Sequence, residues 1–151
     1  MTKGATTSVF TIYSSAESTK PGGTAYYTGL QSTIDGSLAK PYIYLTDAIA
    51  KAYELGAPYA SATVTIKLVE DTSGGSKNVH YMRRLDPSEQ QYIPSKYDTT
   101  QSTKIIIDSN NGNQQIVNYK LRDKFTFNVG AGLTIKNVLF NGLDSVAYYD
   151  T

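Results

Sequence analysis

A strict alternation of apolar and polar residues runs from position 60 to position 69. One side of an extended chain would carry four apolar residues, Ala62, Val64, Ile66 and Leu68, and the other side mostly Thr and Lys. This pattern predicts a strand with one buried face. A shorter run at residues 8–13, with β-branched Thr11 and Ile12, predicts another strand.

Between residues 45 and 58 the apolar spacing changes to three and four residues. The resulting stripe consists of Leu45, Ala48, Ile49, Ala52 and Leu55. It predicts an amphipathic helix that lies over an apolar surface. Thr46 is the expected N-cap, and Gly56 followed by Pro58 is expected to end the helix.

Short apolar segments follow one another closely after residue 104. They lie at 105–107, 115–119, 125–129, 133–135 and 138–140. The connections are too short for crossover helices, so two alternatives remain. The segments form antiparallel hairpins, with Asn111-Gly112 as one turn, or they form successive strands of parallel coils.

The spacing of the apolar residues favours coils. The apolar residues can be placed on three successive faces: Ile105 and Ile107, then Ile116, then Phe125 and Phe127. Leu133 and Ile135 then return over the first face after 28 residues. Residues 138–140 then return over the second face, 22–24 residues after Ile116. Such repeats are typical of a β-helix. Asn137 is the candidate corner residue, because Asn tolerates the left-handed conformation of a sharp bend.

Composition removes several classes of function. The chain has 151 residues, a net charge of +1 and no Cys, which excludes disulfides and thiolate metal sites. The balanced charge gives no electrostatic reason to bind nucleic acid. No apolar run approaches the ~18 residues of a membrane span. A single histidine, His80, argues against a His-rich metal site or a Ser-His-Asp triad, and it is expected to pack at an inner corner.

Two stretches of the sequence are similar to a known superfamily. GLTIKNVLFNG at 132–142, and the entry segment at 36–72 followed by VHYMRR at 79–84, resemble the pectin-lyase-like right-handed parallel β-helix proteins, closest to large ciliate surface proteins. The resemblance implies an all-β fold, a right-handed parallel β-helix with one amphipathic capping helix. It implies an N-terminal strand and extended polar loop over 1–40, then the helix-capped start of the β-helix over 41–151, in a single domain overall.

The resemblance also implies where partners would bind. Members of the superfamily continue for many coils, whereas this sequence ends about a dozen residues after Phe140. We therefore expect a fragment, or a chain whose open C-terminal coil is covered by a protein partner or a second copy. The expected stacking surface is Phe127, Ile135 and Phe140. The helix stripe is expected to close the other end, where exposed strand edges would invite association.

The expected function is a structural, non-enzymatic assembly module of an extracellular or cell-surface protein. No catalytic residue, cofactor or metal is expected, because Asp108, Arg122, Asp123 and Asp144 match no catalytic motif of the superfamily's enzymes. The alternative is a carbohydrate-binding or polysaccharide-cleaving β-helix, in which Tyr26 and Tyr27 would stack on sugar rings. The Ser/Thr-rich loops are candidates for O-linked glycan.

Overall fold

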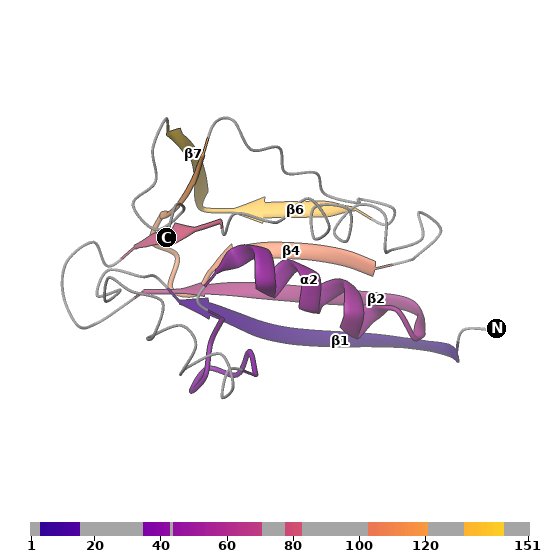
Figure 1. The fold of residues 1–151 in the computed structure, drawn as a ribbon. Coiled ribbons are helices and arrows are strands. Elements are labelled where there is room, and N and C mark those ends of the chain that lie inside the picture. Colours follow the sequence, from indigo (N-terminus) through magenta and orange to yellow (C-terminus); the bar gives the residue numbers. More distant parts are fainter. Residues whose placement is uncertain are drawn as a thin grey trace.

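The described part of the chain consists of seven strands and one helix. The computed structural model describes residues 4–15, 35–42, 44–70, 78–82, 103–120 and 132–143. The strands are β1 (Gly4–Ser15), β2 (Tyr59–Val69), β3 (Val79–Tyr81), β4 (Thr103–Ser109), β5 (Gln115–Lys120), β6 (Leu133–Lys136) and β7 (Val138–Leu143), and the helix is α2 (Leu45–Gly56). The chain is thus mainly β, as the sequence predicts (Figure 1).

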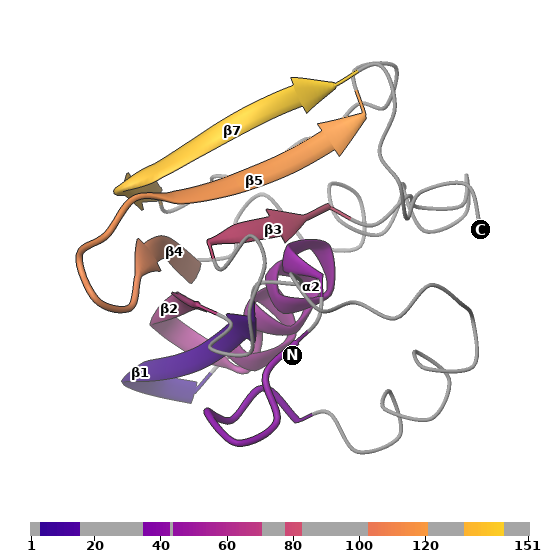
Figure 2. The ribbon, with the colours of Figure 1, turned by 90° about the vertical axis from the view of Figure 1, so that its left-hand side faces the viewer.

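The strands form two parallel sheets. The first has the order β1-β2-β4-β6 and the second the order β3-β5-β7. All pairs of these strands are parallel, so the hairpin alternative is wrong. The Asn111-Gly112 turn instead leads from β4 in one sheet to β5 in the other. Figure 2 shows β3, β5 and β7 side by side, with α2 below β3.

The register of the sheets agrees with the spacing in the sequence. Ile105 pairs with Leu133, a separation of 28 residues. In the second sheet Ile116 pairs with Leu139, a separation of 23 residues. Asn137 lies between β6 and β7 with a φ of 55°, in the left-handed region. The predicted third face around Phe127 lies outside the described residues.

The core lies on the inner face of the first sheet. An isoleucine from each strand aligns there in register: Ile12, Ile66, Ile107 and Ile135. The α2 helix packs against this face over β1, β2 and β4 (Figure 1). The burial of alternate residues in β2 and β4 confirms the predicted strand face, with Val64, Leu68 and Ile105 at most 1% exposed.

The helix ends at Gly56, as predicted, but its N-cap is not the predicted residue. Its N-cap is Tyr44, in an extended conformation and without a side-chain capping bond. Thr46 lies inside the first turn and is buried, because the apolar stripe already starts at Leu45. At the other end Ala57 stays right-handed. Gly56 serves close packing, because a Cβ there would overlap the Thr103 side chain of β4.

The first strand is longer than its apolar pattern suggests. β1 pairs with β2 from Gly4 to Ser15, so the N-terminal segment belongs to the same sheet as the predicted β-helix region. On its outer edge, residues 36–42 add main-chain bonds. Tyr13 N–H donates to Gly36 O, and Tyr42 N–H donates to Tyr13 O, both at 2.8 Å. Backbone pairing thus extends the strand over polar residues that hydrophobicity does not mark.

Candidate functional site

A polar network that runs from buried His80 to an exposed turn lies where β2 and β4 end and the chain passes to the second sheet. His80 Nε2 is 2.8 Å from Gln115 Oε1. Gln115 Nε2 donates to Asn113 O at 3.2 Å and to Glu70 Oε1 at 3.3 Å. Asn113 Nδ2 also donates to Glu70 Oε1, at 3.4 Å. The network therefore connects the interior of β3 to the surface turn between β4 and β5.

The network indicates which ring nitrogen of His80 carries the hydrogen. Because the amide nitrogen of Gln115 faces Glu70, its oxygen faces the ring, and His80 Nε2 must carry the hydrogen. His80 Nδ1 is buried and makes no hydrogen bond among the described residues. The neutral ring fits this enclosure, whereas a charged ring would lose its hydration.

Burial lowers the pKa of His80 to about 4. The hydrogen bond to Gln115, the main chain of Ser15 and the charge of Glu70 oppose this shift, but burial outweighs them. His80 is fully buried, as predicted, but it lies in the middle of β3 and not at a corner. At neutral pH the ring is uncharged, so it contributes to packing and hydrogen bonding.

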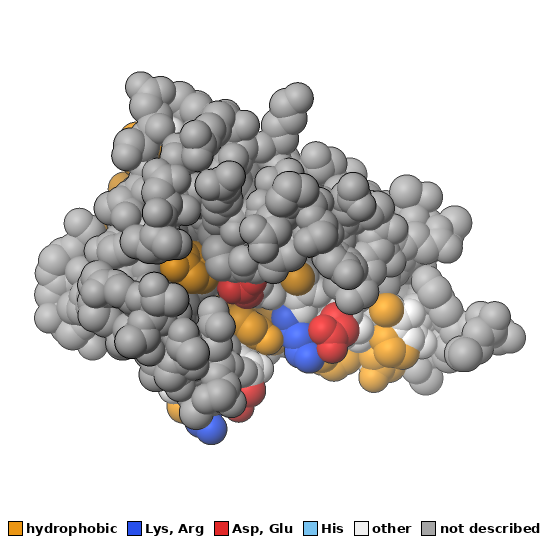
Figure 3. All heavy atoms as spheres, viewed as in Figure 1, with side chains coloured by type: hydrophobic (Ala, Val, Ile, Leu, Met, Phe, Trp, Pro, Cys, Tyr) orange, Lys and Arg blue, Asp and Glu red, His pale blue; other side chains and the backbone are white. Residues whose placement is uncertain are grey.

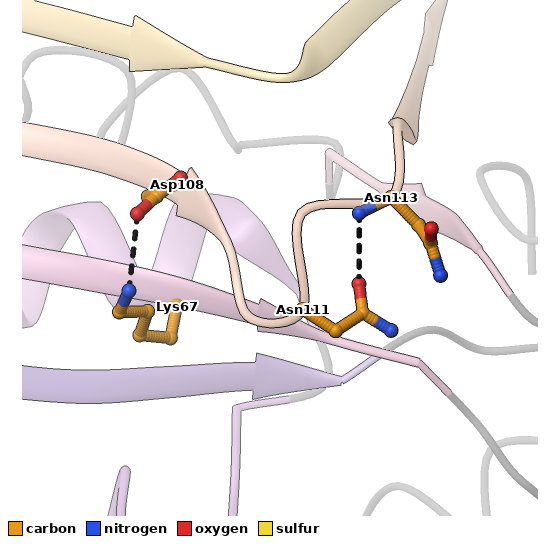
Figure 4. Close-up of polar contacts among 4 residues, drawn as sticks. All are labelled: Lys67, Asp108, Asn111 and Asn113. Atoms are coloured by element: carbon orange, nitrogen blue, oxygen red, sulfur yellow. Dashed lines mark hydrogen bonds and ion pairs between the residues drawn. The ribbon is translucent and has the colours of Figure 1, made fainter.

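The outer face of the first sheet carries a row of charged residues. Lys67 Nζ lies 3.0 Å from Asp108 Oδ2, and the two side chains are 30% and 19% exposed (Figure 4). Lys136 pairs in register with Asp108 on its other side. Asp108 therefore has a lysine at the paired position of each neighbouring strand, Lys67 on β2 and Lys136 on β6. Among the described residues no three His, Cys, Asp or Glu side chains gather as a metal site would need.

The outer face of the second sheet carries an apolar row beside a polar one. Val79, Ile116 and Leu139 pair in register across β3, β5 and β7, and Leu139 is 48% exposed. In the next row, Asn141 Nδ2 donates to Asn118 Oδ1 at 3.1 Å. Stacked amide side chains of this kind tie neighbouring parallel strands together.

The predicted helix stripe is buried as a unit. Leu45, Ala48, Ile49 and Ala52 are at most 1% exposed, and Leu55 packs against the core from a partly buried position. On the outer side of α2, Lys51 and Glu54 form an ion pair at 3.2 Å. Figure 3 shows the face on which α2 lies, with basic and acidic side chains side by side among hydrophobic ones.

The residues predicted for assembly are only partly described. Ile135 is 42% exposed, and Phe140 is partly buried against the core. Phe127 and the candidate sugar-stacking residues Tyr26 and Tyr27 lie outside the described residues. So do three of the charged positions weighed as candidates, Arg122, Asp123 and Asp144.

Sequence reasoning did not find the polar network or the outer apolar row. Glu70 and Gln115 are far apart in sequence, and neither stands in a recognisable motif. A usable signal was present at Gln115, because it occupies an inward position in the alternation of β5. A polar residue at an inward position implies a buried partner.

Comparisons with protein-family models, curated proteins and solved structures found no match. In the described part of the chain, α2 is too short and too polar to cross a membrane.

Proposed function

We propose that this chain is the start of a right-handed parallel β-helix that serves as a structural assembly module. The succession of strands supports the coil. Along the chain β3 follows β2, β5 follows β4, and β7 follows β6. The two sets of strands are arranged in the same order in their sheets. Such an order arises when a chain winds repeatedly through the same two faces.

The helix would act as the cap of one end. Its buried stripe covers the inner face of β1 and β2, which would otherwise expose apolar core at the first coil. The main-chain bonds from residues 36–42 to β1 cover part of the same edge. Both features protect an end that would otherwise associate with other strands.

The observation that carries the assembly role is the change in exposure along the isoleucine row. Ile12, Ile66 and Ile107 are at most 5% exposed, whereas Ile135, in the same row on β6, is 42% exposed. Leu139 on β7 is 48% exposed. A protein partner, or a second copy of the chain, stacked on this end would bury these side chains. In our proposal the module belongs to an extracellular or cell-surface assembly.

Sedimentation velocity over a protein concentration series tests this role. We expect concentration-dependent dimers or filaments of the full chain. Ile135→Glu should weaken association about tenfold or more, because a charge would be buried in the contact. Val9→Glu is the matched control, since Val9 is 73% exposed on the opposite edge strand, and it should leave association unchanged.

Two outcomes would contradict the proposal. One is a chain that stays monomeric over the whole series, and the other is equal weakening by Ile135→Glu and Val9→Glu. Incubation with acidic polysaccharides separates the carbohydrate alternative. Release of unsaturated or reducing sugar would show a polysaccharide-cleaving enzyme instead of a structural module.

A further inference from the structure

The chain contains the dipeptide Asn-Gly twice, in two different structural settings. Asn111-Gly112 lies in the exposed turn between β4 and β5, and Asn141-Gly142 lies inside β7. Asn-Gly is the sequence in which the side-chain amide is most open to attack by the next main-chain nitrogen, because glycine has no side chain to obstruct it. The two sites therefore share chemistry and differ in conformation.

At Asn111 the turn fixes the side-chain carbonyl group with a hydrogen bond. Asn111 Oδ1 accepts a hydrogen bond from Asn113 N–H at 3.1 Å (Figure 4). This bond closes a small ring that contains both the side-chain carbonyl carbon of Asn111 and the main-chain nitrogen of Gly112. Gly112 has a φ of 81°, and apart from its two chain neighbours no residue has a heavy atom within 4 Å of the position its Cβ would take. The side-chain carbonyl group of Asn111 is thus held in place within the turn, and the turn is exposed to water.

We propose that Asn111 is a site of spontaneous conversion to aspartate and isoaspartate, driven by the geometry of this turn. The Gly112 nitrogen loses its proton to solvent base and bonds to the side-chain carbonyl carbon of Asn111. The side-chain amide nitrogen takes up a proton from water and leaves as ammonia, and a cyclic imide remains. Water then opens the imide at either carbonyl, which gives the two acids. The Asn113 N–H donates to the oxygen on which negative charge develops, as an oxyanion-hole donor does.

At Asn141 the same reaction is suppressed by the strand. Asn141 and Gly142 are held in the parallel ladder with β5, and the Asn141 amide donates to Asn118 Oδ1. Extended backbone holds the next nitrogen away from the side-chain carbonyl carbon. Reaction there requires local opening of the ladder, which lowers its rate.

The conversion would alter the network described above. Isoaspartate adds one carbon to the main chain of the turn, and both products add a carboxylate. The neighbouring residue Asn113 holds Glu70 and Gln115 through its side-chain amide and its carbonyl. A longer turn with a second negative charge near Glu70 would weaken these bonds.

The test is peptide mass spectrometry after incubation of the full native chain in mildly alkaline buffer. Enzymatic methylation of isoaspartate serves as a second readout. We expect conversion at Asn111 to be about tenfold or more faster than at Asn141. In denaturant the two rates should converge, because both sites are then unstructured.

Two variants show which asparagine gives the aspartate and isoaspartate products. Asn111→Gln should abolish it, because the longer side chain forms the cyclic product far more slowly, and Asn141→Gln should leave it unchanged. Native rates that are equal at the two sites would overturn the proposal. A native rate at Asn111 below its rate in denaturant would also overturn it, because the turn would then protect the residue.

Discussion

His80 is an ionisable side chain enclosed between the two sheets, so its protonation is coupled to folding. The folded protein holds its pKa at about 4, whereas a histidine in an unfolded chain has a pKa of about 6.5. Between these values the unfolded chain binds the proton and the folded chain does not. Stability therefore rises with pH across this window.

The first prediction follows from this coupling. The contribution of His80 to the free energy of unfolding should be fully present above about pH 6.5. It should fall by about 3 kcal/mol in total as the pH drops to about 4. Urea denaturation at a series of pH values measures it. His80→Gln removes the titrating group and keeps an amide that can hydrogen-bond, so its stability should vary less with pH in this window. The same pH dependence in both proteins would contradict the prediction.

At the scale of elements, the end of α2 depends on one close contact with β4. Gly56 has no room for a Cβ beside the Thr103 side chain. Intrinsic helix propensity alone predicts that Gly56→Ala would stabilise a helix by about 0.5–1 kcal/mol. The contact reverses this sign, because the helix would have to move away from the sheet.

Gly56→Ala should therefore destabilise the protein by about 1–3 kcal/mol. Equilibrium urea denaturation measures the change, and a double-mutant cycle with Thr103→Ala identifies its cause. In the Thr103→Ala background two of the three nearest atoms are absent, so the cost of Gly56→Ala should be smaller. A stabilising Gly56→Ala would show that the helix end can move freely.

The sequence predicted elements where the signal is local. The stripe from Leu45 to Leu55 and the alternation in β2 each specify a period and a buried face. The spacing from Ile105 to Leu133 also predicted a parallel register, and the two residues are paired in parallel strands. Contacts such as Gly56 with Thr103 have no local signature, since they depend on how the elements pack. The same holds for the polar partners Glu70 and Gln115.

At the scale of the whole molecule, the protection of main-chain amides from hydrogen exchange should depend on the position of their strand in the sheet. β2 lies between β1 and β4 and beneath α2, whereas β6 ends the order of the first sheet among the described strands. Opening β2 disrupts both neighbours and the helix, so its amides should exchange only through near-global unfolding. The amides of β6 should exchange faster.

Native-state hydrogen exchange at two protein concentrations connects this difference to assembly. At low concentration, β6 amides should exchange faster than β2 amides, because opening β6 breaks fewer contacts. At high concentration, stacking at the Ile135 end should slow exchange in β6 and leave β2 unchanged. β1 ends the same sheet on the other side and serves as the internal control. Equal slowing of β1 and β6 with concentration would contradict a specific contact, because the predicted stacking surface includes β6 and not β1.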